Sequence, residues 1–323
     1  MDDCPYHRPW SIASPLGIVH RLAATVFFLF FSLAGCQSRH TVTLALLGDL
    51  MLGRSVDPKL DSLAYLTPDL STADLALANL ESPFAPILPA SDSTYNLCAL
   101  SVRAGLLHAW SFDLLSLANN HSLDCGPDGP AGTRSALQAV GITSIGPGMQ
   151  PIYRELNGLH LAFLAFDDIS SPLDENAAVQ SIRSARLTGA LVVVSIHWGA
   201  EYQGGASDRQ KSLANQFAAA GAALVWGHHP HVLQPAEWIG SQPCEDLEPS
   251  QGCTLVLYSL GNALFDQGGL DDTRRSALVV VTLDADGLTG IRTVPFEINV
   301  VNSRIVQPDA GIAEKIQERL NLP

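Results

Sequence analysis

Short runs of apolar residues alternate along the chain with segments of helical periodicity. The apolar runs, typical of buried strands, cover residues 41–47, 74–78, 112–118, 142–145, 159–166, 191–196, 222–226, 254–260 and 277–283. Helical spacing of the apolar residues covers 58–66, 101–110, 128–140 and 207–220. Continuous apolar strands that alternate with helices predict an α/β fold whose strands are covered on both faces.

An acidic residue or a histidine stands just past the end of five of these strands. The five residues are Asp49, Glu81, His121, His197 and His229. In α/β sheets the ligand crevice lies beyond the carboxyl ends of the strands. We therefore expect these side chains to gather in one site.

The strand at 222–226 leads into three histidines within four positions, Gly227-His228-His229-Pro230-His231. Neutral imidazole is the commonest protein ligand for a transition metal. Residues i and i+2 of an extended segment point the same way, so we expect His229 and His231 to bind one ion. A solvated, histidine-rich loop is the alternative interpretation of such a short motif.

The candidate metal ligands combine carboxylates, one amide oxygen and imidazoles. They are Asp49, Glu81, Asn120, His197, His229 and His231. This mixed set suits one or two divalent ions, with Mn, Fe or Zn the expected metals. Such a site generates a hydroxide nucleophile for a phosphoryl or acyl centre. His121, beside Asn120, is the expected proton donor to a leaving oxygen.

Two flanking residues are candidates for substrate binding. The guanidinium of Arg54 is suited to binding a carboxylate or phosphate bidentately, although a surface or helix-capping role fits it equally. Glu201 is expected either in the cleft or at its rim. Trp198 and Trp226 are expected in the core.

Composition limits the classes of partner. The chain has 323 residues, of which 47% are hydrophobic and 15% charged, and its formal net charge is −14. Nucleic-acid binding needs clustered cations, so we expect no nucleic-acid partner. The acidity serves solubility or helps to concentrate divalent cations.

The N-terminus carries an apolar run of 13 residues, 22–34, which ends at Leu33-Ala34-Gly35-Cys36. A membrane-spanning helix needs about 20 residues, so the run suits a signal peptide. The ending resembles a bacterial lipobox, in which the cysteine is acylated. We expect residues 1–35 to be a lipoprotein signal peptide, 36–40 a lipid-anchored tether and 41–323 the folded domain, on the extracytoplasmic side of the membrane. An ordinary cleaved signal with a chance cysteine is the alternative.

Export would favour pairing of the remaining cysteines. Cys244 and Cys253 flank a polar, loop-like segment, and a disulfide between them would leave Cys98 to pair with Cys125. The chain contains no CxxC pair, which argues against a thiolate zinc knuckle.

Six motifs together carry a family resemblance. They are 48–54 (GDLMLGR), 79–83 (NLESP), Asn119-Asn120-His121 with Asp124 and Gly126, 197–202 (HWGAEY), 227–231 (GHHPH) and 258–262 (YSLGN). In this order they resemble the CapA family of capsule-synthesis, poly-γ-glutamate-associated proteins, which is related to calcineurin-like metallophosphoesterases. The motifs lie between residues 41 and 283, nearly all of the expected mature chain.

The resemblance implies a four-layer α/β/β/α sandwich of metallophosphoesterase type. It also implies a role in the biosynthesis or anchoring of a capsule or poly-γ-glutamate polymer. The implied partners are that polymer or its precursor, the membrane and other capsule-assembly membrane proteins.

Matched motif to motif, Asp49 resembles the family's first metal carboxylate, Asn120 and His121 resemble its Asn-His pair, and His197, His229 and His231 resemble its later imidazole ligands. Metallophosphoesterases have Asp-x-His at the first motif, where this chain has Met51. Glu81 stands where they have a bridging aspartate. Three activities stay open: a metal-dependent hydrolase acting on the polymer, a metallophosphoesterase, and a non-catalytic polymer-binding scaffold.

If Cys36 carries the lipid, Cys36→Ser should release the protein from membranes or leave it unprocessed. Membrane fractionation and the intact mass of the mature chain measure this. Unchanged partition together with an unchanged mature mass would contradict the lipobox interpretation.

Overall fold

The computed structural model describes residues 40–90, 93–240 and 252–322. They belong to one compact unit, His40–Pro323. The expected signal peptide, Cys36 and Cys244 lie outside the described residues. No helix within the described ranges is long and apolar enough to cross a bilayer.

The first of two large sheets has the strand order β16-β15-β14-β1-β2-β5-β6, with β13 also paired to β1. Its strands are β1 (Val42–Leu50), β2 (Leu75–Leu80), β5 (Leu114–Ser116), β6 (Thr143–Ile145), β13 (Asn262–Leu264), β14 (Arg275–Asp284), β15 (Gly287–Asn299) and β16 (Arg304–Val306). β1, β2, β5 and β6 are parallel, whereas β14, β15 and β16 pair antiparallel. The carboxyl ends of the parallel strands therefore lie at one edge.

The second sheet has the order β11-β12-β10-β9-β8-β7. Its strands are β7 (Gly148–Leu156), β8 (Leu159–Asp167), β9 (Leu191–His197), β10 (Ala222–His228), β11 (Leu233–Gly240) and β12 (Cys253–Leu260). The four central strands are parallel, and β7 and β11 pair antiparallel at the two edges. Two short strands, β3 (Phe84–Ala85) and β4 (Ala99–Leu100), form a separate pair.

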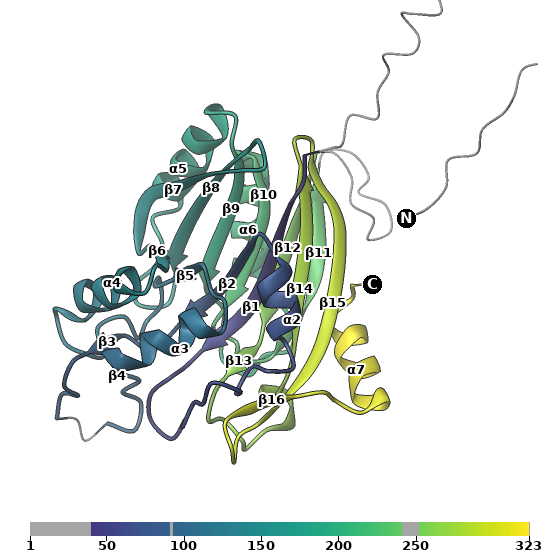
Figure 1. Cartoon of the computed structure of the whole chain (residues 1–323). Helices are drawn as coiled ribbons and strands as arrows, with labels where there is room; N and C mark the ends of the chain where they lie inside the picture. The colour runs from purple at the N-terminus through teal and green to yellow at the C-terminus, as the bar shows by residue number, and fades with distance from the viewer. Residues whose placement is uncertain (1–39, 91–92, 241–251, 323) are drawn as a thin grey trace, which may run out of the picture. The chain divides into compact units, whose positions relative to one another are not determined.

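Six α-helices and two 3-10 turns complete the described residues (Figure 1). They are α2 (Thr67–Thr72), α3 (Ala104–Ala109), α4 (Gly129–Ala139), α5 (Glu175–Leu187), α6 (Asp208–Ala220), α7 (Ala310–Leu320), η1 (Ser101–Arg103) and η2 (Asp271–Thr273).

Three apolar clusters show how these elements are layered. Successive β1 residues alternate between them, as the pleat requires: Leu44 and Leu46 pack between the two sheets, whereas Ala45 and Leu47 pack against α2, α3 and α4. The third cluster packs α5 and α6 onto the outer face of the second sheet. The expected α/β class and the four-layer α/β/β/α arrangement are therefore confirmed.

The helix expected over 58–66 is wrong. Backbone N–H groups there bond three residues back, as from Leu66 to Leu63, so this segment forms successive turns. An apolar spacing of three residues fits such turns as well as it fits an α-helix. The helix begins at Thr67, where Pro68 occupies its first turn, a position that proline tolerates well.

One of the two expected disulfides is present in the described residues. Cys98 is bonded to Cys125, as predicted. The Cys244–Cys253 pair stays a prediction, because Cys244 lies outside the described residues.

Ser207 begins α6 with a capping box, in which its hydroxyl accepts from the Gln210 N–H and the Gln210 side chain accepts from the Ser207 N–H. Ser207→Ala should lower the free energy of unfolding by about 0.5 to 2 kcal/mol, the usual cost of losing an N-cap. Urea denaturation measures this change. The control is Ser212→Ala, inside the same helix and exposed, which should be neutral or slightly stabilising. Equal losses in both variants would contradict the capping role.

Candidate metal centre

The two sheets contribute polar side chains to one buried place at the carboxyl ends of their parallel strands. Asp49 is the second-last residue of β1, and Glu81 follows β2 directly. His197 and His228 are the last residues of β9 and β10. All four are buried, although each is polar. A buried polar cluster at the ends of strands from both sheets is unfavourable unless its members satisfy one another or bind a ligand.

Two glycines allow the strand ends to come together. A Cβ on Gly48 would lie 1.9 Å from the carbonyl oxygen of Gly261, and a Cβ on Gly227 would lie 2.1 Å from that of Tyr258. No other residue fits at such distances. The glycine before Asp49 and the glycine before His228 therefore set how closely the two sheets approach at the site.

Asp49 is the centre of the cluster. Asn79 Nδ2 donates to Oδ1 at 2.8 Å, and the backbone N–H of His229 donates to Oδ2 at 3.0 Å. The Nδ1 atoms of His228 and His231 lie 3.5 and 3.4 Å from its oxygens. Burial alone would raise the pKa of Asp49, but the contact with His228 and the electrostatic influence of the neighbouring imidazoles outweigh burial and hold the pKa well below its ordinary value. Asp49 is thus an ionised carboxylate.

Glu81 and His197 lie next to Asp49 and are equally buried. Burial, reinforced by the negative charge of Asp49, raises the pKa of Glu81 well above its ordinary value. Burial lowers the pKa of His197, so its ring is neutral. His197 Nε2 lies 2.9 Å from Asn120 Oδ1 and 3.6 Å from Glu81 Oε1. Ligand-type atoms of Asp49, Glu81 and His197 all lie within 4.8 Å of one another.

His229 and His231 form a second group with Glu201, whose ligand-type atoms also lie within 4.8 Å of one another. The two histidines share a site, as expected, but not through an extended segment. Their φ angles of 95° and 57° place both in the left-handed region. That backbone is strained for non-glycine residues, and such strain concentrates at functional sites. The turn is held by the bond from the His229 N–H to Asp49 and by contact of His231 Nδ1 with Asn262 Oδ1 at 2.9 Å.

The two groups are contiguous. The rings of His197 and His229 lie 4.8 Å apart between centroids, and Asp49 touches both groups. Burial, with the charge of His231, lowers the pKa of His229 to about 4, which keeps this ring in the neutral form that binds metals. The donors are therefore imidazoles, of which those of His197 and His229 are neutral, together with carboxylates and an amide oxygen.

This donor set fits a divalent metal. Glu81 Oε2 and both ring nitrogens of His228 are buried without a hydrogen-bond partner among the described residues. An unpartnered buried oxygen costs free energy unless a ligand meets it. A cation there would also favour the ionised form of Glu81, which burial and Asp49 oppose.

His121 stands at the edge of this cluster and not in it. Its Nδ1 contacts Asp124 Oδ2 at 2.9 Å, and its side chain is 17% exposed. Asp124 is itself held by the N–H of Leu97 at 2.7 Å. An imidazole oriented by a fixed carboxylate, with its Nε2 unused by that contact, has the arrangement of a general acid or base.

Arg54 does not present a free guanidinium. It forms a bidentate pair with Asp266 and lies over the ring of Phe265, 5.4 Å from its centroid. A substrate anion would therefore meet an arginine that is already neutralised. Glu201, by contrast, is exposed beside the imidazoles of the site. Trp198 and Trp226 are fully buried, as expected.

Met51 occupies the position of the metallophosphoesterase histidine, yet it does not face the metal ligands. Its side chain is fully buried in the apolar cluster beneath α2, α3 and α4, and its sulfur accepts from the N–H of Gly53 at 3.0 Å.

Three residues of the site were not among the metal ligands, the proton donor or the substrate-binding residues predicted from the sequence. The side-chain amide of Asn79 contacts Asp49, Glu81 and His197. Asn262 contacts the ring of His231. The ring of His228 lies beside the Asp49 carboxylate. All three stand inside the quoted motifs. Only the pairing register, which sets Asp49 beside Asn79 on β2 and beside Asn262 on β13, shows what the two amides contact.

Residues 43–267 match the model of the family described as bacterial capsule synthesis protein PGA_cap. The chain belongs to this family. It is 29% identical over 301 residues to the PGA biosynthesis protein CapA of Bacillus subtilis, covering 84% of this chain and 76% of that protein. It is 29% identical over 323 residues to the capsule biosynthesis protein CapA of Bacillus anthracis, covering 89% and 75%. The resemblance carried by the six motifs is thus confirmed.

Two solved structures are also similar. A hypothetical protein from Thermus thermophilus aligns with a TM-score of 0.47 and 18% identity over 79% of this chain and 99% of that one. A purple acid phosphatase from yellow lupin aligns with a TM-score of 0.40 and 9% identity over 86% of this chain and 55% of that one.

The double change His229→Ala and His231→Ala should lower the metal content of the purified protein, because it removes two of the three ligand-type groups in one set. Elemental analysis after dialysis against Mn, Fe or Zn measures this. His160→Ala is the control, since that imidazole contacts Glu155 and Tyr153 on the β7–β8 hairpin. Unaltered metal content in the double variant would show that the site is misassigned.

Proposed function

We propose that this protein acts in the biosynthesis or anchoring of a capsule or poly-γ-glutamate polymer, with a metal-dependent hydrolase-like site at the carboxyl ends of its strands. Family membership supports the biological role. The observation that carries the chemistry is the juxtaposition of two groups of ligand-type atoms. The first is Asp49, Glu81 and His197, and the second is Glu201, His229 and His231. The proposed metal ligands are Asp49, Glu81, Asn120, His197, His229 and His231.

A divalent metal held there would polarise a scissile carbonyl or phosphoryl group and make bound water a nucleophile near neutral pH. The protein's own residues would position the reacting groups. Asp49 stays ionised and anchors the His229 turn, while Asn120 contacts His197 Nε2. His121, oriented by Asp124, would hold the proton for a leaving oxygen or nitrogen.

The proposal includes export and lipid anchoring through Cys36, which would place the site on the extracytoplasmic side of the membrane. The Cys98–Cys125 disulfide supports this, because disulfides persist mainly in oxidising compartments. The proposed partners are the polymer or its precursor, the membrane and other capsule-assembly membrane proteins.

The experiment that tests the proposal combines metal analysis with a substrate screen of phosphate monoesters, phosphate diesters and γ-glutamyl amides. Metal-dependent cleavage of a γ-glutamyl amide supports the proposed activity. Cleavage of phosphate esters alone would replace it with a metallophosphoesterase. Binding of polyglutamate with no turnover of any of these compounds would replace it with a scaffold role.

His121→Ala should leave the metal content unchanged and slow the turnover of whichever substrate is cleaved by about 10²- to 10⁴-fold, the usual range for a lost general acid. Steady-state kinetics beside elemental analysis separates the two effects. His108→Ala, an exposed histidine on α3, serves as the control and should keep full turnover. Turnover that survives His121→Ala intact would remove this residue from the chemistry.

A further inference from the structure

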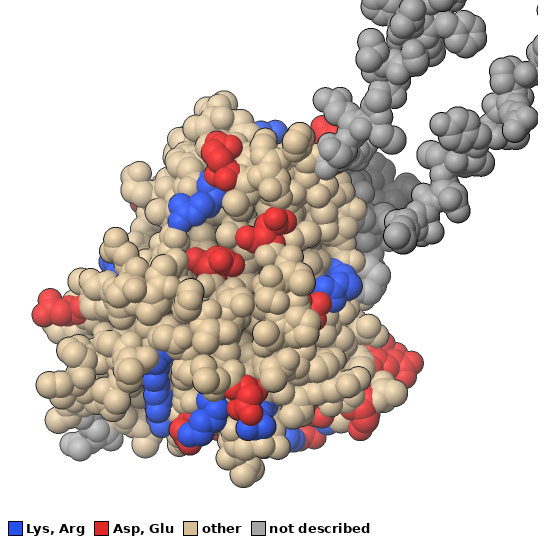
Figure 2. Space-filling view, viewed as in Figure 1, with Lys and Arg blue, Asp and Glu red and all other residues tan. Residues whose placement is uncertain are grey.

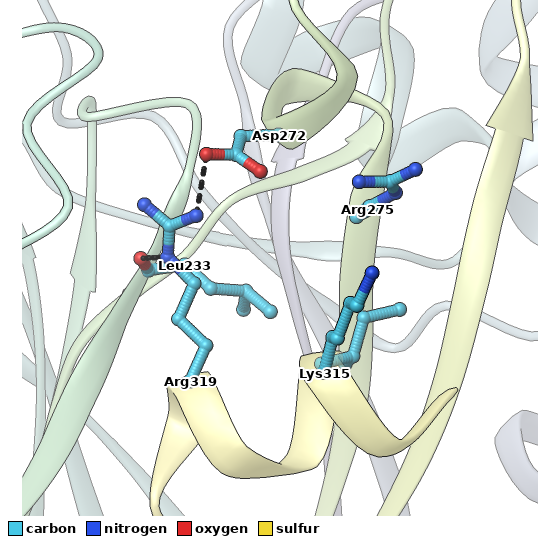
Figure 3. A pocket seen from close by; sticks show the side chains of 6 residues that line it. Leu233, Asp272, Arg275, Lys315 and Arg319 are labelled. Carbon is cyan, nitrogen blue, oxygen red and sulfur yellow. Dashed lines mark hydrogen bonds and ion pairs between the residues drawn. The ribbon is translucent and has the colours of Figure 1, made fainter. Parts of the chain in front are cut away.

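A second polar hollow lies between α7 and the segment around η2, and it contains none of the candidate metal ligands. Its volume is about 170 Å³. It is lined by Leu233, Asp272, Arg275, Lys315, Ile316 and Arg319 (Figure 3). Three of the six lining side chains are cationic and one is acidic, in a chain whose formal net charge is −14.

The cations of this hollow differ in how far they are neutralised. Arg319 is fixed: it pairs with Asp272 at 2.5 Å and donates to the carbonyl of Leu233 at 3.0 Å. Among the described residues, Arg275 forms two longer ion pairs, each at 3.4 Å, with Glu297 and with Asp271. Lys315 lines the hollow without an ion pair or hydrogen bond to any of the described residues. Lys315 is therefore the cation of the hollow whose charge no described carboxylate neutralises.

The orientation of Lys315 and Arg275 indicates which kind of ligand the hollow would bind. Figure 3 shows the Lys315 ammonium directed toward the Arg275 guanidinium, with the Arg319–Asp272 pair on the other side of the hollow. Like charges that face each other repel, and an anion between them converts that repulsion into two attractive contacts. Ammonium and guanidinium groups together are suited to the oxygens of a carboxylate or a phosphate.

Other arginines of this protein are differently placed. Arg209 forms a bidentate pair with Asp168 and also contacts Glu175, and Arg54 pairs with Asp266. On the face shown in Figure 2, basic and acidic side chains are interspersed. Lys315 and Arg275, two cations that face each other across a hollow, thus differ from these arginines, which are paired with carboxylates.

The hollow and the metal centre share two loops. Arg319 lies against Gly204, where an added Cβ would be 2.3 Å from the guanidinium, and Gln234, next to Leu233, donates to the carbonyls of Gln203 and Gly205. The same loop, which joins β9 to α6, carries Glu201 of the candidate metal centre.

The second loop, from Asn262 to Thr273, also connects the candidate metal centre with the hollow. Asn262, which contacts His231, donates to the carbonyl of Thr273, the residue after Asp272. These hydrogen bonds connect residues of the candidate metal centre with residues beside the hollow.

We propose that Lys315 and Arg275, beside the Arg319–Asp272 pair, form an anion-binding subsite that takes one carboxylate or phosphate group of an acidic ligand. The hollow is smaller than the roughly 300 Å³ at which pockets for drug-sized ligands begin, so it suits one acidic group with a short stem. The identification of that group as a carboxylate of the polymer rests on the proposed function. The anion subsite itself does not.

The test measures binding of tri-γ-glutamate and, separately, of inorganic phosphate to the purified full chain by calorimetry. Lys315→Gln should weaken binding of the occupying anion by about 3- to 10-fold, the range for one partly exposed charged contact. Arg275→Gln should act in the same direction. Binding should also weaken as salt is raised. Lys211→Gln, an exposed lysine on α6, is the matched control and should bind as the unaltered chain does.

Removal of divalent metal from the unaltered chain with a chelator should leave anion binding in place, so failure of the metal-dependent proposal is distinguishable from failure of this one. Tri-γ-glutamate binding that depends on Lys315 supports a polymer carboxylate as the occupant. Phosphate binding alone, with the same dependence, supports the subsite with a phosphate occupant. Absence of binding by both anions, or binding that Lys315→Gln and Arg275→Gln leave unchanged, overturns the proposal.

Discussion

The structure depends on one fully buried carboxylate, that of Asp49. An ionised group without access to water is stable only if polar partners surround it. These partners come from separate parts of the chain: Asn79 from β2, the His229 N–H from the turn after β10, and the rings of His228 and His231. Because β1 belongs to one sheet and β10 to the other, this carboxylate fixes how the two halves of the sandwich meet.

Close approach of the backbones makes that arrangement possible. Gly48 and Gly227 immediately precede Asp49 and His228, and each lies against a carbonyl of the β12 strand or the turn after it. The two glycines thus leave room for the carboxylate and the imidazole that directly follow them. The strained His229 and His231 turn is tolerated because its backbone and rings are bonded to Asp49 and Asn262.

Charge is distributed unevenly around this centre. The candidate metal centre gathers carboxylates and imidazoles, whereas the hollow beside α7 gathers cations. The loops at 201–205 and 262–273 border both places. The acidic ligand proposed for the hollow would therefore meet surroundings of opposite charge at the two places.

Sequence by itself determined the α/β class, the buried central strands and the motifs that carry the ligands. Those features follow from local periodicity and from the rule that polar groups gather past strand ends. It did not determine the edge strands β7 and β11 or the strand β15, because their mixed burial weakens the apolar pattern. The turns at 58–66 were also indistinguishable from a helix, because both fit the same apolar spacing.

Tertiary structure alone decided which polar residues touch. Strand register placed Asn79 and Asn262 beside Asp49, and the strained turn placed His229 and His231 together without an extended backbone. It also showed that Arg54 is already paired with Asp266, and that Lys315 faces Arg275 from an element 40 residues away in the sequence. Such contacts join distant segments of the chain, and no local pattern of residues encodes their geometry.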